Sequence, residues 1–280
     1  MSLGDTEPGI LVDDDAGVRT ITLNRPARKN ALDWPAWCLL RDNLESTARS
    51  GDVRALVITG SGGAFCSGAD ISTPDPRHPT NKLRILSDVA MALHDLPIPT
   101  IAKVSGVAVG AGWNLALGCD LVVATPGARF SQIFVRRGLS MDLGGSWLLP
   151  TLVGLQQAKR LALLGEMIES AEAHGLGLVT WVVDDAAIDA FVDDKARRLA
   201  AGPPVALGQI KMLLNEGASG TLRDALAAES RAQVINFGTD DVGAAYTAFA
   251  QKKDPVFTGR WSVPPPGSQA RNQNGDNIHA

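Results

Sequence analysis

The sequence is poor in cysteine and histidine. Its 280 residues include 3 cysteines and 4 histidines, and Cys38, Cys66 and Cys119 lie far apart in the chain. Because the cysteines form no CxxC pair and no HExxH motif is present, the sequence predicts no metal site. An odd number of isolated cysteines also disfavours a disulfide framework and is typical of a reducing compartment.

Long apolar runs and an excess of basic residues are lacking too. No run reaches the ~18 residues typical of a membrane span. The first residues, MSLGDTEPG, lack the basic start and apolar centre of a signal peptide. Lys and Arg number 26 against 30 Asp and Glu, which disfavours an extended nucleic-acid-binding surface. The composition therefore predicts a cytoplasmic globular protein with no nucleic-acid or membrane partner.

The first half of the chain alternates strand and helix patterns. Asp33 is a candidate N-cap for a helix that reaches about Arg49, a second helix ends near residues 91–96, and a short one covers about 111–117. Residues 72–82 contain 3 prolines and are expected to form a surface loop. Strands are expected at residues 18–24, 53–59, 100–105 and 120–124.

Helical periodicity dominates after residue 145. The last residues, 261–280, are rich in Pro, Gly, Asn and Gln and are expected to form a disordered tail. Alternating strands and helices followed by helices alone predict an α/β fold with a parallel sheet and a C-terminal helical layer. The helices expected in this half cover residues 155–164, 186–200, 205–214, 222–237 and 242–252.

Two glycine-rich segments are the candidate site. Residues 57–70 (VITGSGGAFCSGAD) and 104–114 (VSGVAVGAGWN) each join a buried strand to small residues and a turn or helix start. Small residues let a ligand approach the main chain, and unpaired amides there can stabilise a developing negative charge on oxygen. The alternative interpretation is two tight turns without a ligand. Phosphate-loop spacings and a GxSxG motif are absent, so Ser67 and Ser105 lack support as nucleophiles.

Several motifs in order resemble the enoyl-CoA hydratase/isomerase (crotonase) superfamily over about residues 17–259. The chain is most similar to the 1,2-epoxyphenylacetyl-CoA isomerase-like branch. The resemblance implies a crotonase-type β/β/α spiral core at residues 10–200 and a C-terminal helical oligomerisation region at 201–260. That region would form a homotrimer or a dimer of trimers. The matching segments are NRPARKNAL (24–32), AFCSGADI (64–71), IAKVSGVAVGAGWNLALGCDLVVA (101–124), GGSWLLPTLVG (144–154) and FAQKKDPVFTG (249–259).

The resemblance also implies a catalytic centre. In the family, two main-chain amides bind the thioester oxygen, and they correspond here to Ala69 and Ala111. The two glutamates of the hydratases fall at Asn114 and Phe134, and neither side chain can exchange a proton. Asn114 would bind water, a substrate carbonyl or local backbone, and Phe134 would be a pocket wall. Two-glutamate hydration is therefore disfavoured.

Asp142, in LSMDLGGSW, coincides with the catalytic aspartate of the isomerase branch, although Met141 replaces the usual proline. One carboxylate suits an isomerisation because it can remove a proton at one carbon and return it at another. A reference pKa of ~3.9 is too low for efficient return unless burial raises it. The alternative is that Asp142 caps the following helix.

Contacts with coenzyme A, which is part of the substrate rather than a separate cofactor, are also implied. Arg28 and Lys29 follow the first strand, and Phe249 and Lys252 are spaced i, i+3 on one expected helix. Each cation could equally be solvated surface. Trp113 and Trp147 would line the acyl pocket or belong to the core. Further residues expected to contact the substrate or CoA are Ala64, Cys66, Gly68, Asp70, Ile71, Gly110, Asn114 and Phe134.

The expected function is an acyl-CoA isomerase that shifts a double bond or an epoxide ring in an enoyl-type thioester. One alternative is an enoyl-CoA hydratase in which Asp142 alone activates water. The other is an acyl-CoA-binding homologue without turnover, which the two missing glutamates favour and Asp142 opposes.

Overall fold

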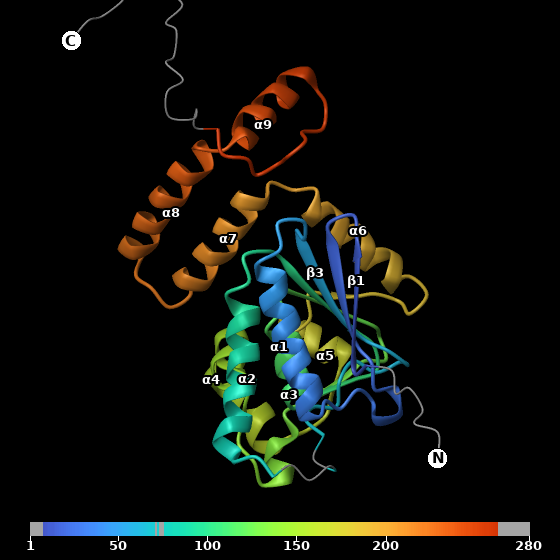
Figure 1. The fold of residues 1–280 in the computed structure, drawn as a ribbon. Helices are drawn as coiled ribbons and strands as arrows, with labels where there is room; N and C mark the ends of the chain where they lie inside the picture. Colours follow the sequence, from blue (N-terminus) through green and yellow to red (C-terminus); the bar gives the residue numbers. More distant parts are fainter. Residues whose placement is uncertain (1–7, 71, 73–75, 263–280) are drawn as a thin grey trace, which may run out of the picture.

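A computed structural model describes residues 8–70, 72 and 76–262 of the chain (Figure 1). Ile71, which was expected to contact CoA, lies outside the described residues. Most of the predicted tail, from residue 263 onward, also lies outside them.

The main sheet has six strands in the order β1-β2-β3-β4-β6-β9. β1 and β2 form an antiparallel hairpin across Ala16 and Gly17, both at positive φ (48° and 81°), as a two-residue turn requires. From β2 to β9 all neighbours are parallel. The strands are β1 (Ile10–Asp15), β2 (Val18–Leu23), β3 (Ala55–Gly60), β4 (Thr100–Val104), β6 (Leu121–Ala124) and β9 (Trp181–Val182).

A smaller sheet has three strands, β5 (Val107–Val109), β7 (Arg129–Ser131) and β8 (Ile168–Glu169). An isolated parallel bridge between Cys66 and Ala108 connects the segment after β3 to this second sheet. The glycine-rich segment 57–70 therefore leaves one sheet and continues beside the other. The strands of the small sheet are two or three residues long, which is why the sequence pattern did not predict them.

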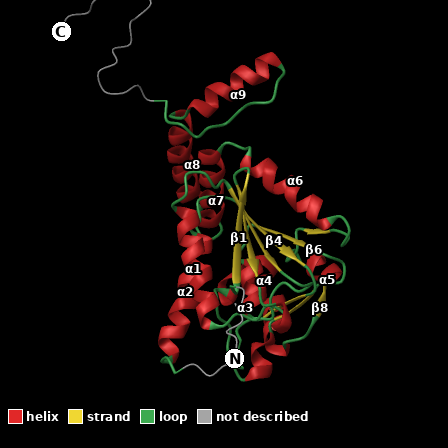
Figure 2. Cartoon of the chain, turned by 45° about the vertical axis from the view of Figure 1, so that its right-hand side comes forward, coloured by secondary structure: helices red, strands yellow, loops and turns green. Residues whose placement is uncertain are grey.

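Helices cover both faces of the main sheet (Figure 2). On one face Leu56 and Ile58 pack with residues of α1, α2, α3 and α4, and on the other Val57 packs with α6. The alternation of side chains along a strand explains the two cores. The helices are α1 (Trp34–Ala48), α2 (Pro79–His94), α3 (Ala111–Leu117), α4 (Gly145–Leu164), α5 (Ser170–Gly175), α6 (Ile188–Ala200), α7 (Pro204–Gly217), α8 (Leu222–Phe237) and α9 (Asp240–Gln251), with short 3-10 turns η1 (Pro26–Arg28) and η2 (Ile133–Arg137).

The expected strands at 18–24, 53–59, 100–105 and 120–124 and the helix at 111–117 are confirmed within a few residues. The predicted N-cap is also confirmed, because the Asp33 carboxylate accepts a hydrogen bond from the Ala36 amide (3.0 Å). The mixed α/β fold class is therefore as predicted. The domain boundaries stay a prediction.

The helix expected at 155–164 is present as the second part of α4; Gly154 (φ 74°, ψ 160°) is not helical and separates it from a first part that begins at Gly145. Two expectations are wrong in detail. The loop expected at 72–82 ends earlier, because α2 begins at Pro79, where a proline fits the first turn. The tail expected from 261 begins with anchored residues: Trp261 pairs with Thr239, and Ser262 donates to the Gly238 carbonyl (2.8 Å).

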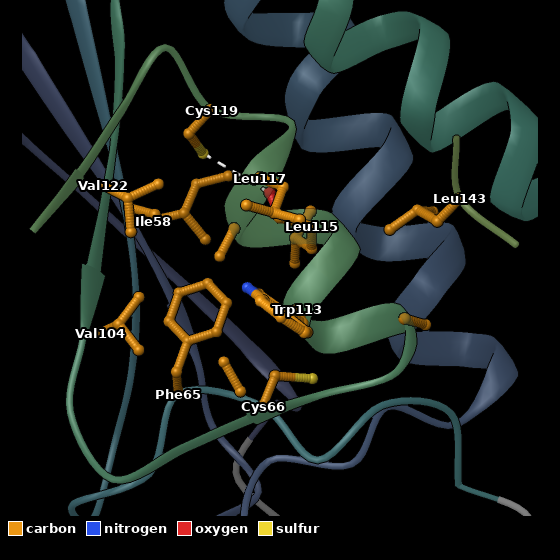
Figure 3. Close-up of a cluster of buried hydrophobic side chains, with 14 of the residues drawn as sticks. Ile58, Phe65, Cys66, Val104, Trp113, Leu115, Leu117, Cys119, Val122 and Leu143 are labelled. Atoms are coloured by element: carbon orange, nitrogen blue, oxygen red, sulfur yellow. Dashed lines mark hydrogen bonds between the residues drawn. The ribbon is translucent and has the colours of Figure 1, made fainter. Parts of the chain in front are cut away.

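A cluster of buried hydrophobic side chains surrounds α3 (Figure 3). Trp113 is fully buried there beside Phe65, and its ring centroid lies 5.6 Å from that of Phe130. Trp113 was expected either to line the acyl pocket or to belong to the core, and the structure supports a place in the core. The packing fixes α3, whose seven residues are all buried, against the segment that follows β3.

Candidate active site

The amide of Ala69 is unpaired because of how its segment pairs with Leu32. In this parallel bridge, Leu32 donates to the Gly68 carbonyl (2.9 Å) and accepts from the Asp70 amide (2.8 Å). Both hydrogen bonds use the neighbours of Ala69, so its own N–H points away from Leu32. Among the described residues it has no hydrogen-bond acceptor.

The amide of Ala111 is unpaired because Ala111 is the first residue of α3. The first amides of a helix have no acceptor within the helix, and no side chain caps this end. Gly110 precedes it at φ 58° and ψ −126°, a conformation that favours glycine. The Gly110 amide donates to the Ser131 carbonyl (2.9 Å), which ties the helix start to the small sheet.

Glycines bring these two amides together. A Cβ atom built on Gly68 would lie 3.6 Å from the Ala111 nitrogen, and one built on Gly112 would lie 2.3 Å from the Cys66 carbonyl oxygen. The start of α3 can therefore sit against residues 66–68 only because both positions lack a side chain. Ala69 and Ala111 line one cavity of about 490 Å³.

Asp142 lines the same cavity. The residue is half-buried, but its Oδ1 atom is inaccessible to solvent and has no hydrogen-bond partner among the described residues. Burial raises the pKa of this carboxyl group to about 6. The helix cap of α4 is Gly144, and no side chain bonds to that end, so the alternative of Asp142 as an N-cap is not supported.

The other residues expected at the site divide into two groups. The cavity is lined by Arg28, Lys29, Gly68, Asp70, Gly110 and Phe134 as well as the three residues described above. Ala64, Cys66, Asn114, Phe249 and Lys252 do not line it. Phe134 is buried beside Gly110, which agrees with the expectation that it forms part of the cavity wall.

Asn114 faces the protein rather than the cavity. Its Nδ2 atom donates to the main-chain carbonyl of Asp142 (2.9 Å), and its Oδ1 atom accepts from Nε2 of Gln132 (2.8 Å). Both side chains are buried. Asn114 therefore contacts the main chain of the Asp142 loop, which is distant in sequence, rather than the cavity or the backbone of its own helix. Gln132 was not singled out in the sequence, because only the tertiary structure brings it to Asn114.

Cys66 and Ala64 are structural. The Cys66 thiol donates to the Asn30 carbonyl (3.0 Å), and its main chain pairs with Val107 and Val109. Burial raises the pKa of this thiol to about 12, so it stays protonated at neutral pH. The Ala64 carbonyl accepts from the Asn30 side chain (2.7 Å). The segment 64–68 thus shapes the cavity without contributing these two residues to its lining.

Four cationic side chains are among the residues that line the cavity. Arg28 and Lys29 are joined there by Arg129 and Arg137, which the sequence patterns did not indicate. None of the four side chains forms an ion pair or hydrogen bond with another described residue. The cavity therefore offers unpaired positive charge to an anionic ligand.

Asp70, which also lines the cavity, is by contrast fully engaged. Its carboxylate accepts from the hydroxyl and amide of Ser72 (2.6 and 3.0 Å) and pairs with Arg25 (3.0 Å). The hydrogen bond from Ser72, with a smaller contribution from Arg25, lowers the pKa of Asp70. Its role in the structure is to hold the chain that follows Ala69.

Phe249 and Lys252 lie far from this cavity within one chain. α9 is at the opposite end of the molecule from α3 (Figures 1 and 2). Phe249 is 86% exposed, and Lys252 follows the helix in a left-handed conformation (φ 53°). The i, i+3 pairing expected on one helix face is therefore wrong, because α9 ends at Gln251.

A second, apolar pocket of about 260 Å³ adjoins the Asp142 loop. It lies between α2, α3 and the start of α4, and Asn114, Leu143 and Trp147 line it. The Trp147 ring stacks edge-on against His94, with centroids 5.4 Å apart. Of the two tryptophans expected near the acyl group, only Trp147 thus borders a pocket.

In the described part of the chain, no group of three or more His, Cys, Asp or Glu side chains could hold a metal ion. No helix there is both long and apolar enough to cross a membrane.

The chain is similar to known proteins over almost its whole length. Residues 13–260 match the family model described as enoyl-CoA hydratase/isomerase. The chain is 38% identical over 258 residues to 1,2-epoxyphenylacetyl-CoA isomerase of Escherichia coli (90% of this chain, 98% of that protein). It is 33% identical over 252 residues to 2,3-dehydroadipyl-CoA hydratase of the same organism (90% and 99%). The crystal structure of an enoyl-CoA hydratase from Bacillus anthracis superposes with a TM-score of 0.87 at 28% identity, covering 90% of this chain and 100% of that one.

Proposed function

Because the chain belongs to the enoyl-CoA hydratase/isomerase family, we propose that it is an acyl-CoA isomerase that shifts a double bond or an epoxide ring. One observation carries this proposal: the unpaired amides of Ala69 and Ala111 and the buried carboxyl group of Asp142 line one cavity. Among the described residues that line the cavity, no second carboxyl group is free, because Asp70 is engaged with Ser72 and Arg25.

The first step follows from the two amides. A thioester oxygen in the cavity would accept hydrogen bonds from Ala69 and Ala111, and these bonds strengthen as negative charge develops on the oxygen. One donor of this kind typically contributes about 2.7–4 kcal/mol to lowering the barrier. The C–H groups next to the thioester, or conjugated with it, become acidic enough for a carboxylate to deprotonate.

Asp142 would then move the proton. Its carboxylate removes a proton from the acyl group, the electron pair is delocalised as an enolate or dienolate, and the new carboxylic acid returns the proton to another carbon. A pKa of about 6 suits both directions, because the group is ionised at neutral pH and is still acidic enough to protonate carbon. These steps use only protein groups, so the proposal includes no separate cofactor.

The alternative within the family is hydration. The relatives include a hydratase at 33% identity, but Asn114 here is bound to backbone and Gln132, and Phe134 cannot act as a base. Only Asp142 would remain to activate water. A binding protein without turnover is the other alternative. Asp142 disfavours it, because its buried Oδ1 atom has no hydrogen-bond partner among the described residues, and such burial destabilises the fold unless it serves a function.

Coenzyme A would bind through the cationic part of the wall, and the chains would assemble as a trimer or a dimer of trimers. Large apolar side chains of α8 and α9 are exposed in one chain, which supports an interface there. Phe249 and Lys252 would then contact the CoA of a neighbouring chain. A cytoplasmic location stays a prediction from the sequence.

The proposal is tested with two substrates. Conversion of a 3-enoyl-CoA to the conjugated 2-enoyl-CoA, followed by ultraviolet absorbance, should proceed with the native protein and be lost in Asp142→Asn. Asp185→Asn, an exposed aspartate on the loop before α6, is the matched control and should retain activity.

Three outcomes contradict the proposal. Turnover that survives in Asp142→Asn removes the role of the base. Hydration of crotonyl-CoA without conversion of the 3-enoyl-CoA identifies a hydratase. An increase in melting temperature with both thioesters but no turnover identifies a binding protein.

A further inference from the structure

Asn114 forms the central link between two loops of the candidate site. The Asp142 carbonyl can only accept a hydrogen bond, so the nitrogen of the Asn114 amide must face it, at 2.9 Å. The Asn114 oxygen then faces Gln132, whose nitrogen donates to it at 2.8 Å. The two side chains are 1% and 0% exposed, respectively. These two hydrogen bonds are therefore enclosed by protein. Together they fix the orientation of the Asn114 side-chain amide.

The loop that Asn114 contacts is conformationally strained. Leu143 and Gly144 are both left-handed (φ 50° and 76°), and leucine adopts this region only at a cost in free energy. The Asp142 carbonyl accepts a second hydrogen bond from the Gly145 amide (3.0 Å). A Cβ atom on Gly145 would lie 2.3 Å from Nδ2 of Asn114, so the loop and the amide are in direct contact. The strained turn persists because its first carbonyl is held from two sides.

α3 carries both this contact and half of the oxyanion site. Ala111 is its first residue and Asn114 lies three residues later, one turn along the same short helix. Since all seven residues of α3 are buried, the helix is a rigid spacer between the amide and the loop. The position of the Asp142 carboxyl group relative to the Ala111 amide is thus set through Asn114.

We propose that Asn114 is a positioning residue, oriented by Gln132, that holds the Asp142 loop in register with the oxyanion amides. This inference rests on the proposed function for its kinetic consequences. Without the contact, the strained loop relaxes and the carboxyl group turns toward solvent. The base becomes weaker and misplaced, while the amides still bind the thioester. The loss therefore falls on kcat rather than on KM.

No other charged group accounts for the state of Asp142. It forms no ion pair with a described residue, and burial is the main cause of its raised pKa. The titratable side chains that line the two cavities beside the loop are Arg28, Lys29, Asp70, Arg129, Arg137 and His94. Release of the loop should thus lower the pKa of Asp142 toward its ordinary value.

The kinetic test compares Asn114→Ala, Gln132→Met and the double variant. Asn114→Ala should lower kcat about 10- to 100-fold, as expected for loss of a group that orients a reacting one. KM should change much less, and the acid limb of kcat/KM should move to lower pH. Gln132→Met should cause a smaller loss of the same kind. The double variant should be no worse than Asn114→Ala, because Gln132 acts through Asn114.

Thr59→Val is the matched control. It removes another buried hydrogen bond from a side chain to a main-chain carbonyl, that of Thr59 to Lys103 (3.1 Å), away from the cavity. This variant should lose some thermal stability and keep the acid limb of the native protein. The proposal is overturned if Asn114→Ala keeps that limb, if its defect is in KM alone, or if the two losses multiply in the double variant.

A measurement without turnover separates this inference from the proposed function. The effect of Asp142→Asn on the melting temperature, measured at about pH 4 and pH 8, reports the pKa of Asp142 in any background. This effect should depend on pH in the native background and less so in Asn114→Ala and in Gln132→Met. Equal pH dependence in all three backgrounds overturns the positioning role, even if no substrate is turned over. A reduced dependence supports it even if the reaction proves to be another one.

Discussion

Gly112 lies against Cys66, so that a methyl group at Gly112 would be 2.3 Å from the Cys66 carbonyl oxygen. This distance is far below van der Waals contact, and the obstacle is main chain that cannot rotate away. The contact seats the start of α3 on the segment that leads to Ala69. The separation of the amides of Ala69 and Ala111 thus depends on the absence of a side chain at Gly112.

Gly112→Ala is therefore expected to push α3 away from residues 66–68. If one amide no longer reaches the thioester oxygen, kcat/KM should fall by about 10²-fold or more. The measurement is kcat/KM with the thioester together with the melting temperature. Gly127→Ala is the control, since nothing lies within 4 Å of its Cβ position and its φ is not positive. Full activity in a folded Gly112→Ala protein would show that the close contact is not needed.

The activity should depend on the ionisation of Asp142. Its pKa of about 6 predicts that kcat/KM is constant at neutral pH and falls as the pH drops through 6, tenfold per unit, because the protonated acid cannot act as a base. A pH profile measured with a non-ionisable acyl group checks this, and Asp185→Asn should give the same profile. If kcat/KM instead falls only as the pH drops through about 4, the carboxyl group of Asp142 is solvated.

The same burial predicts that Asp142→Asn stabilises the fold. The folded-state pKa lies above the unfolded value, so the carboxyl group favours folding below about pH 4, and this contribution is lost as the pH rises through 6. At pH 8 the substitution should raise the free energy of unfolding by up to about 3 kcal/mol. Thermal unfolding at pH 4 and pH 8 measures the difference. A variant that is less stable at pH 8 would contradict it.

Removing the cations of the cavity wall should weaken CoA binding selectively. Arg28→Ala/Lys29→Ala is expected to raise KM for the CoA thioester about tenfold with little change in kcat, because charge-assisted contacts to phosphate are lost. Added salt should reduce the difference. Arg129→Ala/Arg137→Ala tests the other two cations in the same way, and Arg84→Ala on α2 is the control.

A pantetheine thioester, which lacks the nucleotide phosphates, distinguishes charge recognition from a loss of shape. Both double variants should leave its KM unchanged. If the variants raise KM equally for the CoA thioester and the pantetheine thioester, these cations do not contact phosphate.

The sequence predicted the local structure where local patterns determine it. The helix at 222–237 and the N-cap at Asp33 depend on side chains within one or two turns, and both are present. The glycine-rich segments were also recognisable, because a close approach of main chain to main chain requires small residues. The resemblance named Ala69, Ala111 and Asp142, and the structure places all three in one cavity.

What sequence reasoning missed depends on tertiary structure. The sequence around an asparagine does not show whether its side chain binds substrate or main chain. Asn114 binds main chain because the fold brings it next to Gln132 and the Asp142 loop, which are 18 and 28 residues away in the sequence. Arg129 and Arg137 were not singled out in the sequence, because only the positions of β7 and η2 in the fold bring them to the cavity. Lys252 was assigned to a helix that ends one residue earlier.

The uncovered apolar side chains of α8 and α9, with Phe249 the most accessible, have a practical consequence. If these side chains pack against other copies of the chain, the same contacts stabilise both the assembly and the fold. By mass action the melting temperature then rises with protein concentration. An assay at nanomolar dilution and a spectroscopic experiment at high concentration would then sample different populations of the same molecule. Kinetic constants and melting curves are comparable only after a dilution series has shown where dissociation begins.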